Sequence, residues 1–236
     1  MTDYQKIERE FADAFGLTRR PVAISFRETP PPGIAKFSGM EPSGCSFWRI
    51  AAKGQSFYTV PGDHYNCAVG AYTHHIDLPK DRAGELEQTI SFMTNAKYIQ
   101  VEEIPGFARL PKTPDVVIYA PLGDTPVDPD VVLFPGQPAR ISLLLETATR
   151  AGVSSRPAFL GRPTCSSLAA ALDHGVVVSS ACIGNRVYTD LGDDELYVAI
   201  RGRDLARVAQ EAQTIVSANA KLADYHRARR KDLATQ

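Results

Sequence analysis

The chain has 236 residues, 44% hydrophobic and 22% charged, a composition typical of soluble globular proteins. With 26 basic and 27 acidic side chains the net charge is −1, which excludes a whole-chain attraction to nucleic acid or to an anionic membrane. The N-terminus lacks the basic and apolar pattern of a secretory signal, and no apolar run approaches the length of a membrane span. We therefore expect a cytoplasmic protein with reduced cysteines.

Hydrophobic periodicity and the positions of Gly and Pro divide the chain into alternating helices and strands. In chain order we expect a helix over 1–17, a strand over 20–26, an irregular connection over 28–44, a helix over 46–54, a strand over 56–60, a turn over 61–64, a helix over 80–96, strands over 114–121 and 129–136, helices over 137–152 and 161–175, strands over 176–181 and 194–202, and a helix from 204 to about 233. This order predicts an α/β or α+β fold, a mixed β-sheet with flanking helices in one compact domain spanning 1–236.

The four cysteines occur as two pairs in similar segments. They are Cys45, Cys67, Cys165 and Cys182. The first cysteine of each pair is followed by Ser, an alanine cluster and a Gly, and the second is followed by a Gly and then by Tyr-Thr. This match predicts an internal duplication, with related halves at about 20–120 and 121–236. If the halves are related, their thiols can meet in one site at the junction.

Four longer segments carry a resemblance to a known family. They are GDHYNCAVGAYTH (62–74), PDVVIYAPLGD (114–124), GRPTC (161–165) and CIGNRVYTDLGDDELYVAI (182–200). Together they resemble the family catalogued as domain of unknown function 169, over nearly the whole chain from Arg20 onward. The resemblance implies a shared α/β fold and a bacterial or archaeal soluble protein, and it implies almost nothing about chemistry.

Thiolate ligation of a metal or an iron–sulfur cluster is the leading interpretation of the cysteines. Thiolates are the preferred ligands of such centres, and four is their commonest number. The metal ligands would be Cys45, Cys67, Cys165 and Cys182. The chain has no Cys-x-x-Cys pair, so the four ligands would have to converge from distant segments.

A cysteine-dependent enzyme that acts on a small carbonyl or carboxylate substrate is the alternative. Its catalytic residues would be Cys67, Cys182, His64 and Arg186, with Tyr72, Tyr188 and Trp48 binding the ligand or cofactor. A nearby cation, imidazole or helix N-terminus can lower a thiol pKa and so activate it. The pair His74-His75 is expected in a strand, where at most one of the two rings faces a given site.

The simplest interpretation is that the cysteines are buried and act only as small apolar side chains. In that case the function would be that of a non-catalytic small-molecule-binding protein. The sequence has no dinucleotide-binding glycine motif, phosphate-binding loop, serine-hydrolase elbow or zinc-protease motif. The expected partner is thus a small-molecule ligand or a metal centre, with no nucleic acid and no membrane, and homo-oligomer formation stays open.

Overall fold

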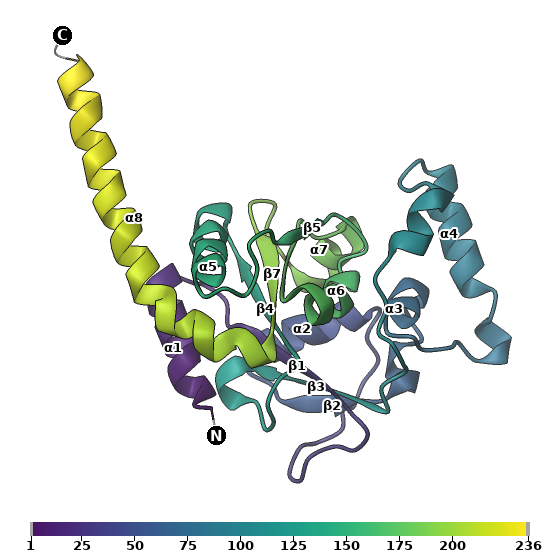
Figure 1. Cartoon of the computed structure of the whole chain (residues 1–236). Helices are drawn as coiled ribbons and strands as arrows, with labels where there is room; N and C mark the ends of the chain where they lie inside the picture. Colours follow the sequence, from purple (N-terminus) through teal and green to yellow (C-terminus); the bar gives the residue numbers. More distant parts are fainter. Residues whose placement is uncertain (1, 235–236) are drawn as a thin grey trace.

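The computed structural model describes residues 2–234 as helices packed on both faces of a β-sheet (Figure 1). The helices and strands are α1 (Tyr4–Phe15), β1 (Val22–Arg27), α2 (Gly44–Ala52), β2 (Phe57–Thr59), α3 (Ala68–Thr73), α4 (Glu85–Asn95), β3 (Val116–Pro121), β4 (Val131–Gly136), α5 (Pro138–Arg150), β5 (Ala158–Leu160), α6 (Ser166–His174), β6 (Val176–Ser179), α7 (Ile183–Thr189), β7 (Leu196–Arg201) and α8 (Leu205–Ala234). Short 3₁₀ turns join them at η1 (Pro61–His64), η2 (Lys80–Arg82), η3 (Val101–Gly106), η4 (Leu122–Asp124) and η5 (Gly202–Asp204). The predicted mixed α/β class is confirmed.

Within the described residues, seven strands form one mixed sheet in the order β2-β3-β1-β4-β7-β6-β5. The β5·β6 pair is parallel, and all the other strand pairs are antiparallel. The strand order is symmetric about the central β1·β4 pair. Outward from β1 come β3 and then β2, and outward from β4 come β7 and then β6, so on both sides the inner strand is the later one in the sequence. A duplicated fold would have this symmetry. The duplication stays a prediction, because strand order alone does not establish common ancestry.

Each face of the sheet has its own apolar core because the central strands are buried on both sides. In β4, Val131 and Leu133 face one core whereas Val132 and Phe134 face the other, as the period of two requires. Helices α1, α5 and α8 cover the second core, and α2 and α6 cover the first. Both long apolar strands predicted from the PDVV sequences are therefore confirmed as β3 and β4.

Three short elements differ from the sequence prediction. Helices α3 and α7 and strand β5 have seven residues or fewer and little hydrophobic periodicity. The expected strand at His74-His75 is wrong. His74 is the C-cap of α3, and His75 has a left-handed backbone with φ 59°, so the two rings leave a helix end. Of the described helices, none is long and apolar enough to cross a membrane.

Candidate thiol centre

The four cysteines lie at the starts of four short helices on the same side of the sheet. Cys45 is in the first turn of α2, and Cys165 directly precedes α6; both side chains are buried in one apolar cluster. Cys67 and Cys182 are the N-caps of α3 and α7 and are partly exposed. All four are free thiols. Helix α2 packs against both α3 and α7, so elements from the two halves of the chain meet here.

The four thiols are close enough to interact electrostatically with one another. Cys45 interacts with the other three, and Cys67, Cys165 and Cys182 interact among themselves. Burial, and then this mutual repulsion of thiolates, raises the pKa of Cys45 well above its usual value. Burial is also the main reason that the pKa values of Cys67 and Cys165 are raised. The structure thus places the four thiols within electrostatic range of one another, and burial keeps three of them protonated at neutral pH.

Each half of the chain supplies a polar partner to a cysteine of the other half. Asn185 in α7 lowers the pKa of Cys45 in α2, and Thr73 in α3 lowers the pKa of Cys165, both in opposition to burial. The Cys67 sulfur accepts a hydrogen bond from the Gly70 N–H at 3.3 Å, which caps α3. These contacts support the deprotonated form that a metal ligand or a nucleophile needs.

Two residues hold the second pair of cysteines in place. The buried Thr164 hydroxyl accepts a hydrogen bond of 2.6 Å from the backbone N–H of Cys182, so the residue before Cys165 fixes the start of α7. The Arg186 guanidinium donates to the carbonyl oxygens of Ser180, Gly192 and Glu195. Arg186 was predicted to act on a ligand, but its guanidinium N–H groups instead form hydrogen bonds with the loops that flank α7.

A pair of buried histidines lies next to α2, where His64 packs against Phe47. The His64 and His74 rings are 5.4 Å apart between centroids. His64 Nε2 lies 2.8 Å from the Thr59 hydroxyl, and His74 Nδ1 donates to the Gly70 carbonyl at 2.9 Å. The other ring nitrogen of each, His64 Nδ1 and His74 Nε2, has no hydrogen-bond partner among the described residues. Burial lowers the pKa of both imidazoles, so both rings are neutral at pH 7.

The histidine pair is expected to make the protein less stable as the pH falls below about 6.5. Between that unfolded-state pKa and the lower folded-state pKa, the unfolded chain binds protons that the folded chain does not. The free energy of unfolding should fall by up to about 1.4 kcal/mol per histidine per pH unit. Urea unfolding between pH 7.5 and 5.5 measures the slope. His64→Gln should reduce it, whereas the exposed His226→Gln should not; an equal slope in all three proteins would contradict the assignment.

Tyr119 and Trp48 are buried polar side chains in the candidate site. Tyr119 in β3 and Trp48 in α2 are buried in the same cluster as Cys45 and Cys165. The Tyr119 hydroxyl has the Thr59 side chain beside it, an interaction that lowers the Tyr119 pKa in opposition to burial. The Trp48 indole N–H has no hydrogen-bond partner among the described residues. The buried hydroxyls of Ser46 and Ser166, each directly after a cysteine, are also unpartnered. Buried polar groups in native proteins are nearly always paired, so this concentration around four thiols is typical of a site that receives a ligand.

The two tyrosines predicted to bind a cofactor do not belong to the apolar cluster that contains Cys45 and Cys165. Tyr72 lines a cavity of about 360 Å³ between α3 and α4. There the Arg109 Cζ lies 4.1 Å from the centroid of the Tyr72 ring, so the guanidinium stacks on the ring. Tyr188 is exposed near the end of α7. Of the predicted site residues, the structure groups Cys45, Cys67, Cys165 and Cys182 with His64 and Trp48. Sequence reasoning missed Tyr119, Thr73 and Asn185, although all three lie in segments that carry the family resemblance.

A single metal ion does not fit the thiol positions. Sulfur ligands lie about 2.3 Å from a zinc ion, so the sulfurs must approach within about 4 Å of one another. Among residues 2–234, no three His, Cys, Asp or Glu side chains are arranged to hold one ion. A centre with several metal atoms has a different requirement, because each thiolate ligates a different atom.

The fold and site define a mixed α/β protein with four free thiols on one side of the sheet, two of them buried and two partly exposed. The model of the family domain of unknown function 169, described as "Uncharacterised ArCR", matches residues 10–211, and the chain belongs to this family. No curated protein and no solved structure matches the chain.

Proposed function

We propose that the chain is a cytoplasmic protein that binds an iron–sulfur cluster through the thiolates of its four cysteines. The observation that carries this proposal is that all four thiols, which come from distant parts of the sequence, influence one another's pKa values. Four thiolates are the usual ligand set of such clusters. Among residues 2–234 no three His, Cys, Asp or Glu side chains are arranged to hold one ion, so each thiolate would have to ligate a different metal atom.

Cluster binding would offset the unfavourable free energy of deprotonating buried thiols that repel one another. Burial and mutual repulsion raise the pKa values of Cys45, Cys67 and Cys165, so uptake must release protons from these thiols. Binding should therefore strengthen as the pH rises. The backbone N–H that caps Cys67 and the polar partners of Cys45 and Cys165 would stabilise the bound thiolates.

Anaerobic reconstitution with ferrous iron and sulfide tests the proposal, and the protein contains its own reporter. Trp48 is the only tryptophan, is 2% exposed and lies three residues after Cys45 on α2. We expect iron and acid-labile sulfide to bind together and to quench the Trp48 fluorescence. Zinc alone is the matched control and should leave the fluorescence unchanged. Iron at trace level, with all four thiols still titratable, would overturn the proposal.

The thiol-enzyme alternative has one observation in its favour. Cys67 is partly exposed and accepts an N–H hydrogen bond at the start of α3, an arrangement that favours a thiolate. Its pKa is nevertheless raised, because burial outweighs this bond. Alkylation rates measured against pH decide between the two: we expect no cysteine to react faster than a free thiol near neutral pH, and a fast-reacting Cys67 would favour the enzyme.

A further inference from the structure

The cavity of about 360 Å³ between α3 and α4 is separate from the thiols, because no cysteine lines it. Its volume is in the range of small-molecule sites. Helix α4 projects from the side of the sheet in Figure 1 and packs against α3, so the cavity lies where the projecting part joins the body. Its walls are mostly apolar and include Ile76, Leu78 and Leu86. Of the residues that line it, only Asp77 and Arg109 are charged.

Arg109 is fixed in this cavity with two of its three guanidinium nitrogens free. Its Nε donates a hydrogen bond to the Tyr72 carbonyl oxygen at 2.8 Å, and its Cζ lies 4.1 Å from the centroid of the Tyr72 ring. Stacking on an aromatic ring holds the planar guanidinium in one orientation. The two terminal nitrogens have no hydrogen-bond or ion-pair partner among the described residues. They form the fork that can bind one carboxylate through two parallel hydrogen bonds.

We infer that this cavity binds a small monocarboxylate with an apolar body. The carboxylate pairs with the terminal nitrogens of Arg109, and the apolar part of the ligand lies against the aliphatic walls. Asp77 lines the same cavity and repels a second negative charge, which favours a monoanion over a dicarboxylate or a phosphate monoester. This inference goes beyond the proposed function and does not depend on it.

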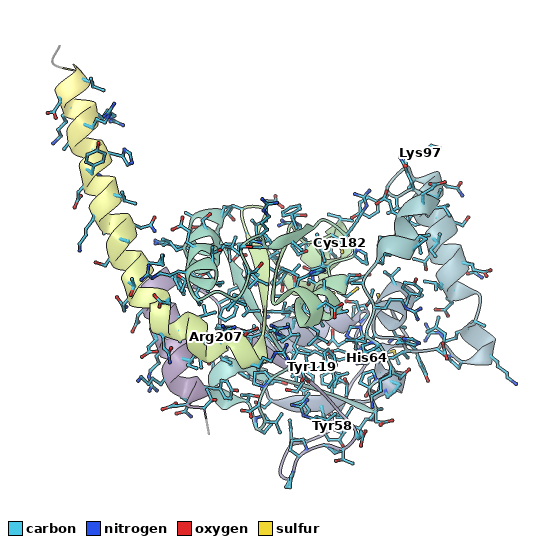
Figure 2. All side chains as sticks on the ribbon, in the orientation of Figure 1. Tyr58, His64, Lys97, Tyr119, Cys182 and Arg207 are labelled. Carbon is cyan, nitrogen blue, oxygen red and sulfur yellow. The ribbon has the colours of Figure 1, made fainter. Side chains whose placement is uncertain are left out.

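Ligand-observed NMR titration of the metal-free chain with hexanoate, hexan-1-ol and adipate tests the inference, because these probes have the same number of carbons and differ in charge. We expect hexanoate to bind more tightly than the other two. Arg109→Gln should weaken hexanoate binding by about 10-fold or more, since it loses hydrogen bonds to a charged group. Lys97→Gln is the matched control and should keep the wild-type affinity. It also removes a positive charge, but Lys97 lies at the far end of the projecting part, away from the sheet (Figure 2).

Two further variants separate the roles of the two charges. Arg109→Lys keeps the positive charge without the planar fork, so its hexanoate affinity should lie between those of the wild-type chain and Arg109→Gln. Asp77→Asn removes the repulsion, so the ratio of adipate to hexanoate affinity should rise by about two- to fivefold. An unchanged ratio would contradict the preference for a monoanion. Three results would each overturn the inference and leave the proposed function standing: no hexanoate binding at millimolar concentrations, equal hexanoate affinity in the wild-type chain and Arg109→Gln, or equally tight binding of hexan-1-ol.

Discussion

Replacement of any one of the four cysteines with alanine is expected to weaken iron binding by more than about 100-fold. Even partners that only orient the ligands of a metal site change its affinity by about 10- to 100-fold, and a lost ligand should cost more. The four single variants should behave alike, because each sulfur interacts with the other three. Iron and sulfide per chain after anaerobic reconstitution measure the effect, and Trp48 fluorescence should remain unquenched.

The same variants carry a second prediction for the metal-free protein. The thiols raise one another's pKa values, so loss of Cys165 should lower the pKa of Cys45 and speed its alkylation at a fixed pH. Ser142→Ala, an exposed position of α5 on the other side of the sheet, is the control and should bind iron normally. A cysteine variant with wild-type iron content would exclude that sulfur as a ligand.

The sequence predicted the large elements well, because their signals are long. The two PDVV strands and the terminal helix have continuous apolar or helical patterns, and the structure has them where expected. The short helices α3 and α7 carry no such pattern, and the sequence predicts no helix or strand at their N-cap cysteines. Prediction therefore failed for the elements that position Cys67 and Cys182.

Of the candidate site, the sequence could predict the four cysteines with His64 and Trp48. The position of Tyr119 depends instead on the pairing of β3 with β1 and β2, which turns its side chain toward α2. The partners Thr73 and Asn185 are more remote still, because each acts on a cysteine of the other half. Such contacts depend on the strand order of the sheet, and no local sequence pattern predicts them. Arg186 is the opposite case. Its charge is conspicuous in the sequence and was predicted to act on a ligand, but in the structure it donates to backbone carbonyl oxygens.

Gly202→Ala is expected to lower the free energy of unfolding by about 4 kcal/mol or more, among the largest effects of a single substitution. Gly202 follows β7, and its N–H donates to the Asp130 carbonyl at 2.8 Å. A Cβ atom there would overlap the Pro129 carbonyl oxygen and lie 2.6 Å from its carbon. Both are backbone atoms at the start of β4, so no side-chain rotation relieves the clash. The β4·β7 pair has to separate, and it links the central pair of the sheet to β6.

Gly106→Ala is the matched control, because a Cβ at that position meets no atom within 4 Å. It should change stability by less than about 1 kcal/mol, and any gain would come from the restricted unfolded chain. Urea unfolding of both variants gives the comparison. Since α7 lies between β6 and β7 in the chain and packs against α2, Gly202→Ala should also lose iron binding in proportion to the unfolded fraction. Wild-type stability in Gly202→Ala would mean that β4 and β7 are not joined as described, and the convergence of the two cysteine pairs would lose its structural basis.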